Sequence, residues 1–115
     1  MEAQATLKYI RVSPQKARLV VDLIRGKRVA EALGILQFTK KRVTHHVEKV
    51  LRSAISNAEQ KAENLDVDEL VVAKAWVNEG SRVKRIRPAP MGRAYRYQRR
   101  TSHVTVVVAT PEEEE

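Results

Sequence analysis

The chain has 115 residues, of which 43% are hydrophobic and 31% are charged, and it has no cysteine. This length suits one domain with a modest core, and the lack of cysteine excludes disulfides, thiolate metal sites and thiol nucleophiles. The net charge is +8, and it rises by four to +12 when the terminal acids Glu112 to Glu115 are left out. We expect these acids to form a disordered tail after a single domain over 1–111. So cationic a domain favours nucleic acid as its partner.

The sequence gives no sign of a membrane partner. No apolar run approaches the roughly 20 residues that a membrane span needs. The N-terminal "MEAQATLKYI" lacks the charged start and apolar middle of a signal peptide. We therefore expect a soluble protein that works in the cytoplasm.

The first third of the chain is predicted to form one strand and two helices. Residues 3–10 alternate apolar and polar positions, and this period of two indicates an edge strand. Ser13 and Pro14 then read as an N-cap and a first helical proline. We predict a helix over 14–25, which Gly26 ends in a left-handed conformation, and a shorter helix over 29–38.

The rest of the domain is predicted to form one long helix and two strands. Apolar residues recur at spacings of three and four from Val43 to Ala62, so this helix must lie across an apolar surface. The β-branched runs 70–78 and 103–109 supply that surface as antiparallel strands. The predicted fold class is α+β, with three helices packed on a small three-stranded antiparallel sheet.

The connection between these two strands, residues 80–100, is the most unusual segment. It holds eight cations and no carboxylate, and its 21 residues far exceed the usual two to five of a hairpin connection. Folded back on itself it has limbs of roughly 33 Å at strand rise, whereas the radius of gyration of the body is only about 12 Å. We expect a body over 1–79 and 101–110 and a long protruding basic β-hairpin, which we call the arm, ordered only in a partner.

The composition of the arm favours nucleic-acid binding over a merely disordered charge run. Seven of its eight cations are arginines, whose forked donors suit phosphate oxygens. Tyr95 and Tyr97 lie among them and offer planar faces for bases or ribose. The first 28 residues are a second basic zone, with seven cations against two acids, which suggests that the body also rests on phosphates.

An enzymatic function has little support in the sequence. Ser13 to Lys16 matches the S-x-x-K pattern of penicillin-binding enzymes, but the companion motifs are missing and helix capping explains Ser13 better. No nucleophile, pair of carboxylates or metal set converges elsewhere. We therefore expect a protein that is not an enzyme.

Metal binding is equally weakly indicated. His45 and His46 are adjacent, so one helix cannot direct both at the same ion. The acids of "DVDE" at 66–69 lack the glycine turn and distal glutamate of a calcium loop, and we expect them in the loop before a strand. We expect no metal and no cofactor. His103, at the foot of the arm, suits an RNA contact and a strand-end hydrogen bond equally well.

The sequence resembles the universal large-subunit ribosomal protein family numbered twenty-two over nearly its whole length. Three pieces carry the resemblance, "YIRVSPQKARLVVDLIRGK" (9–27), "VLRSAISNAE" (50–59) and "EGSRVKRIRPAPMGRAYRYQRRTSHVTVVV" (79–108). The third is highly specific, because the glycine start, the "GRA" turn and "RTSH" before a valine-rich strand occur together and in order.

The resemblance implies a body on the outside of the large ribosomal subunit near the tunnel exit, with the arm threaded inward through ribosomal RNA. It implies a role in subunit assembly, neighbouring large-subunit proteins as partners, and a hairpin tip that contacts the nascent polypeptide in the exit tunnel. An organellar copy would read much the same. Contacts with ribosomal RNA are expected at Arg11, Lys16, Arg18, Arg25, Lys27, Arg82, Lys84, Arg85, Arg87, Arg93, Tyr95, Arg96, Tyr97, Arg99, Arg100 and His103. Tunnel-lining residues are expected at Lys84, Arg85, Pro90, Met91, Gly92 and Arg93.

The tip departs from the family pattern. The family often has a basic residue after the tip proline and another before the "GRA" turn, where this chain has Ala89 and Met91. The resemblance therefore implies a tip less cationic than the family pattern. The acidic tail is no part of the family pattern.

The rival hypothesis is a DNA-architectural protein, whose β-ribbon arms carry arginines and a proline wedge into the minor groove. Arg87, Pro88 and Pro90 fit such an arm. These arms work in pairs on an obligate dimer, however, and the predicted helices show no second apolar stripe for a dimer interface. We expect the chain not to form a homo-oligomer.

Overall fold

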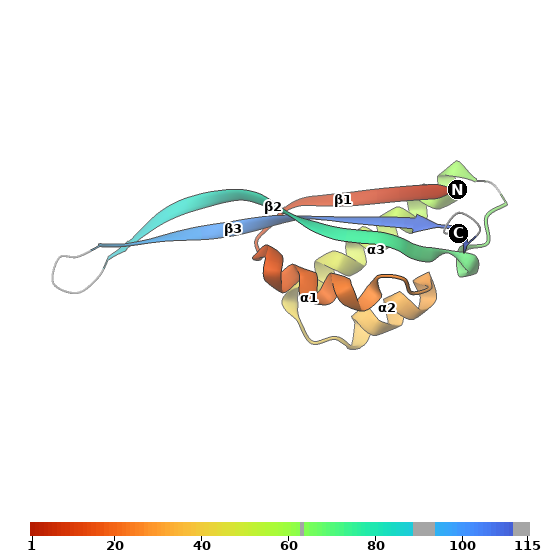
Figure 1. Cartoon of the computed structure of the whole chain (residues 1–115), viewed down its shortest axis with the longest axis horizontal. Coiled ribbons are helices and arrows are strands. Elements are labelled where there is room, and N and C mark those ends of the chain that lie inside the picture. Colours follow the sequence, from red (N-terminus) through yellow and green to blue (C-terminus); the bar gives the residue numbers. More distant parts are fainter. Residues whose placement is uncertain (63, 89–93, 112–115) are drawn as a thin grey trace.

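The computed structural model describes residues 1–62, 64–88 and 94–111, with the backbone alone at 83, 85–88 and 94–99. One antiparallel sheet has the strand order β1-β3-β2, so the last strand of the chain is the central one. The helices gather at the body end of this sheet, and the β2–β3 hairpin extends well beyond them (Figure 1). The predicted fold class is confirmed. The elements in chain order are β1 (Glu2–Ile10), α1 (Pro14–Ile24), α2 (Val29–Phe38), α3 (Arg42–Lys61), the 3-10 helix η1 (Val67–Glu69), β2 (Val71–Pro88) and β3 (Ala94–Ala109).

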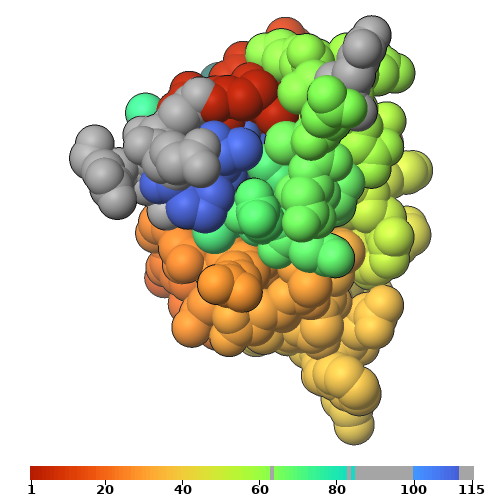
Figure 2. All heavy atoms as spheres, turned by 90° about the vertical axis from the view of Figure 1, so that its right-hand side faces the viewer, coloured from red at the N-terminus to blue at the C-terminus, as the bar shows by residue number. Residues whose placement is uncertain are grey.

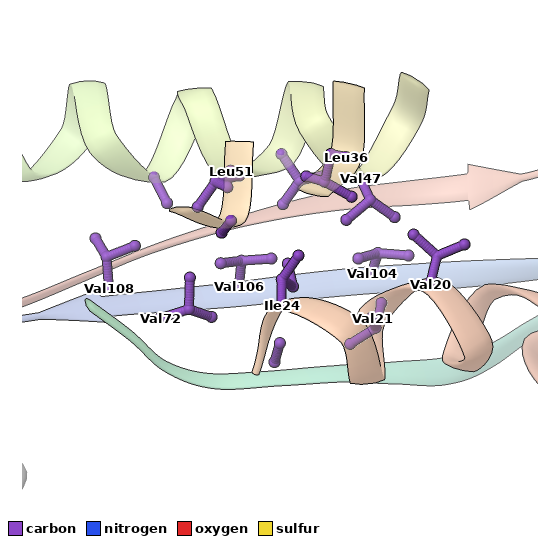
Figure 3. Close-up of a cluster of buried hydrophobic side chains, with 14 of the residues drawn as sticks. Val20, Val21, Ile24, Leu36, Val47, Leu51, Val72, Val104, Val106 and Val108 are labelled. Carbon is purple, nitrogen blue, oxygen red and sulfur yellow. The ribbon is translucent and has the colours of Figure 1, made fainter. Parts of the chain in front are cut away.

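The core lies between the sheet and the helices. Val104, Val106 and Val108 occupy alternate positions of β3 and point toward Val47 and Leu51 of α3, and all five are fully buried (Figure 3). Figure 2 looks at the end of the body opposite the arm, and there α2 lies below the strands while α3 runs along their side. Alternate residues of β3 thus pack against the residues of α3 that recur at spacings of three and four, as the sequence predicts.

The helices begin and end close to the predicted residues. Gly26 has the expected left-handed backbone, with a φ of 80°, directly after the C-cap of α1. Ser13 stands at the predicted N-cap, but the prediction that its hydroxyl caps the helix is wrong, because its side chain makes no capping hydrogen bond. Its carbonyl accepts from the Ala17 amide at 3.1 Å, and its side chain lines a surface groove.

The two long strands do not stop at the edge of the body, as the predicted protruding β-hairpin requires. The ladder runs through the arm from the pair Arg82 and Arg100 to the pair Pro88 and Ala94. The β-branched runs of the sequence end at 78 and 103, because apolar alternation stops there. Backbone hydrogen bonds need no buried face, however, so the ladder continues where the side-chain pattern ends.

The molecule is long and narrow as a result. It measures 66 × 25 × 22 Å, and its radius of gyration of 17.4 Å exceeds the roughly 13 Å of a compact chain of this length. The β2–β3 hairpin extends beyond the helices along the longest dimension of the molecule (Figure 1). That the arm takes its shape only in a partner stays a prediction. The predictions for the tip from Pro90 to Arg93 and for the acidic tail lie outside the described residues.

Candidate nucleic-acid interface

The register of the arm sets tyrosines opposite arginines. Arg85 pairs with Tyr97 and Arg87 pairs with Tyr95 along the ladder. Paired positions of an antiparallel ladder share one face of the ribbon. The arm therefore presents aromatic and cationic positions together, which is the combination that binds the bases and phosphates of single-stranded nucleic acid.

The arm joins the body at a bulge. Glu79 pairs with Ser102 and Arg82 with Arg100, so two residues of β2 stand opposite Thr101 alone. The Thr101 hydroxyl donates to the Ser81 carbonyl at 2.7 Å across this bulge. A bulge bends a ribbon and increases its twist, so this hydrogen bond helps to fix the direction in which the arm leaves the body.

Gly80 permits this junction through its lack of a side chain. A Cβ atom built at Gly80 would lie 2.4 Å from the Thr101 Oγ1 and 3.1 Å from the His103 Cε1. Both distances are shorter than ordinary contact, and Thr101 is itself buried. The glycine is required by close packing of the two strands at the base of the arm.

His103 serves the strand-end hydrogen bond, one of its two expected roles. The Tyr9 amide donates to its Nδ1 at 3.0 Å, and the two rings meet edge to face with centroids 4.8 Å apart. Tyr9 has a φ of 61°, an unusual value for a residue with a side chain. The Ser102 hydroxyl donates to the Val12 carbonyl at 2.7 Å nearby. β1 is thereby held against the foot of the arm, while an RNA contact of His103 stays a prediction.

Two of the predicted RNA-binding arginines make contacts inside the body. Arg25 donates to the Ala75 carbonyl from Nε at 3.0 Å and from a terminal nitrogen at 2.7 Å, and it pairs with Asp22 at 2.7 Å. Arg18 donates to the Val77 carbonyl at 3.0 Å. Both side chains therefore hold α1 against β2. The sequence shows the charge of these arginines but not their contacts with β2.

A basic groove lies beside the base of the arm, and its volume is about 870 Å³. Four segments line it: the turn after β1, α1, the start of α3, and β3 at Arg100. The structure brings three predicted residues together here, Arg11, Lys16 and Arg100, and it adds Lys41 and Arg42, which sequence reasoning missed. The run Lys40 to Arg42 was the available signal. The residues lining the groove are Ile10, Arg11, Val12, Ser13, Lys16, Leu19, Lys41, Arg42, Val43, His46 and Arg100.

Three more predicted residues have described side chains that do not line this groove. Lys27 is exposed after α1, and Lys84 is exposed on the arm. Arg82 is exposed and pairs with Glu79 at the foot of the arm. The side chains expected at Arg85, Arg87, Tyr95, Arg96, Tyr97 and Arg99 lie outside what the structure describes.

The described part of the chain gives no support to a metal site or to a membrane-spanning helix. Among the described residues, no three His, Asp or Glu side chains are placed to hold a metal ion. Asp66 instead accepts from the Asp68 amide at 3.0 Å in the turn before β2, as expected of this loop. None of the described helices has both the length and the apolar character needed to cross a bilayer.

Comparison with known proteins identifies the family. The family model described as ribosomal protein L22p/L17e matches residues 5–109, which include the whole arm and nearly all of the body. The chain belongs to the L22p/L17e family. It is 61% identical over 112 residues to the large ribosomal subunit protein uL22 of Solibacter usitatus, covering 97% of this chain and 99% of the relative. It is 54% identical over 113 residues to uL22 of Oceanobacillus iheyensis, covering 98% of this chain and 99% of the relative. The expected resemblance is confirmed.

Membership of the L22p/L17e family places this chain, with its arm and its groove, in the large ribosomal subunit. The chain is a structural protein of the large ribosomal subunit and not an enzyme. Because its relatives are of bacterial type, its place is on the ribosome in the cytoplasm. Its partners are ribosomal RNA and neighbouring ribosomal proteins of that subunit.

Proposed function

We propose that this L22p/L17e chain binds large-subunit ribosomal RNA along its arm and on the basic face of its body. By doing so it assembles and holds the subunit, and the tip of its arm lines the nascent-peptide exit tunnel. One observation carries this proposal: a molecule 66 Å long and 25 Å wide whose protruding part, 80–100, holds eight cations and no acid.

The shape and charge of the arm suit a place between RNA segments. A two-stranded ribbon needs a spacing of only about 10 Å from what lies on its face, so it suits a narrow gap between RNA helices. Phosphates on both sides of such a gap repel each other, and arginines between them remove that repulsion. The arm therefore stabilises a packed RNA arrangement that the RNA alone would resist.

The body keeps the arm in a fixed direction while it rests on the RNA surface. The bulge at Gly80 and the hydrogen bond from Thr101 to Ser81 join β2 to β3 at the base of the arm. The hydrogen bond from the Tyr9 amide to His103 holds this base against β1. A ribbon fixed at its base enters a channel at a lower cost in conformational entropy than a free loop. The tip then reaches the tunnel wall with Lys84, Arg85, Pro90, Met91, Gly92 and Arg93.

Salt dependence tests the binding mechanism. If the arm neutralises six to eight phosphates, the logarithm of affinity for large-subunit RNA falls against the logarithm of salt with a slope of about −4 to −7. Fluorescence anisotropy of the full chain with a labelled RNA fragment measures this slope. A slope near −1 contradicts the mechanism, and stronger binding to duplex DNA with measurable bending supports a DNA-architectural protein instead.

A shortened arm tests the placement of the tip. The register pairs Val83 with Arg99 and Arg85 with Tyr97, so deleting 83–85 together with 97–99 shortens both limbs equally. We expect the shortened protein to enter large subunits, because the body contacts remain, and to lose cross-linking of its tip to a nascent chain. The matched control deletes 83–85 alone, which shortens only one limb and shifts the register of the ladder. Failure of the balanced variant to enter subunits contradicts the proposed division between body and arm.

A further inference from the structure

We propose that the basic groove beside the base of the arm holds an unpaired RNA nucleotide, with its phosphate on the cations and its base or ribose against the apolar wall. This inference rests on the proposed RNA-binding function and names the form of RNA that one part of the protein takes. It concerns the body and not the arm, and it draws on Lys41, Arg42 and Leu19, to which the sequence assigns no role.

The charges around the groove select an anion. Five cations line it from four segments of the chain, His46 adds a ring that can donate a hydrogen bond, and the lining residues include no Asp or Glu. The cations Arg11, Lys16, Lys41 and Arg42 are all exposed, and none of them forms an ion pair within the described part of the chain. Arginine forks and lysine ammonium groups from several sides suit a phosphate group.

The apolar residues that line the groove suit a ligand that has an apolar face as well as a phosphate. Ile10, Val12, Leu19 and Val43 line it together with the cations, and the Leu19 side chain is 55% exposed. A paired RNA backbone offers phosphates and hydroxyls to a protein and has no apolar face to place there. An unpaired nucleotide has one, because its base is free of the helix stack. A volume of about 870 Å³ lies within the range of pockets that enclose small ligands.

The position of the groove links it to the arm. Arg100, at its rim, pairs along the ladder with Arg82 at the first step of the arm. An RNA strand that follows the cations of the arm toward the body therefore reaches the groove next. In this proposal the arm takes phosphates, and the groove takes one nucleotide out of the helix.

The experiment compares two RNA hairpins that differ by one unpaired nucleotide. The full chain is titrated against a fluorescent, fully paired hairpin and against the same hairpin with a single-nucleotide bulge. We expect the bulged hairpin to bind about fivefold more tightly, the effect of burying a small apolar surface. Leu19→Ala should remove most of this preference. The matched control is Leu23→Ala, one turn further along α1, 42% exposed and outside the lining of the groove, which should keep it.

The charges are tested by paired substitutions. Lys41→Ala with Arg42→Ala removes two cations of the groove, and Lys49→Ala with Lys74→Ala removes two exposed cations elsewhere. We expect the first pair to weaken binding of the bulged hairpin about tenfold more than the second pair does. All four positions are exposed, so the variants should unfold at the wild-type temperature.

The outcomes separate this inference from the function on which it rests. Equal affinity of wild-type protein for both hairpins, with the expected salt slope, overturns the groove inference and leaves RNA binding intact. Failure to bind either hairpin overturns both. A hexaglutamate peptide is the third probe: if it binds and is lost with Lys41→Ala and Arg42→Ala while the bulge has no effect, the groove takes an acidic protein segment and not RNA.

Discussion

Gly80→Ala tests the close packing at the base of the arm. The added Cβ would lie 2.4 Å from the Thr101 Oγ1, which cannot swing away without losing its 2.7 Å hydrogen bond to the Ser81 carbonyl. Overpacking costs about 1–3 kcal/mol, and the reduced freedom of the unfolded chain returns about 0.4–1 kcal/mol. We therefore expect the free energy of unfolding to fall by about 1–2 kcal/mol, which lowers the melting temperature by roughly 4–8 °C.

The same substitution at Gly34 is the matched control. Gly34 lies inside α2, and a Cβ there would meet no atom within 4 Å. Because alanine favours a helix over glycine by about 1 kcal/mol, Gly34→Ala should raise the free energy of unfolding by about that amount. Urea denaturation measures both variants. If Gly80→Ala also stabilises the protein, or if its cost is unchanged when Thr101 is first replaced by alanine, the steric argument is refuted.

Two further predictions concern the body. Leu51→Ala removes a fully buried side chain between α3 and the sheet, so urea denaturation should show a loss of about 2–5 kcal/mol, and a loss below 1 kcal/mol would contradict the proposed core. Arg25→Ala removes the hydrogen bonds to the Ala75 carbonyl that fasten α1 to β2, and it should cost about 1–2 kcal/mol. Arg52→Ala breaks only the exposed pair with Glu48 and should cost about 0.5 kcal/mol or less, so equal costs for the two arginines would show that the contact with β2 contributes nothing.

The helices and the body strands could be predicted because their side chains repeat with the period of the backbone. Val43 to Ala62 has a helical period, and 103–109 has a run of valines that only a central strand would bury. Gly26 was predictable for a local reason, since a helix end needs a left-handed residue there. The helical period, the strand run and the helix end are each set by residues close together in the sequence, so they can be predicted from it.

The limits of the arm could not be predicted in the same way. Its strands continue to Pro88 and resume at Ala94, although no apolar alternation marks them. The groove was also beyond sequence reasoning, because Arg11, Lys41 and Arg100 come together only through the fold. Likewise, the residue type of Arg25 does not show that its side chain donates to a backbone carbonyl of β2, and its RNA contact stays a prediction.

Sedimentation tests the central claim most directly. A lysate of cells that express the tagged full chain is washed at high salt and separated on a sucrose gradient, with a variant in which the arm cations are replaced by glutamine run in parallel. We predict that the full chain stays with the large subunit, because its arm is embedded in RNA, and that the variant is released. A full chain that washes off the subunit, or that travels with DNA, would contradict the proposed function.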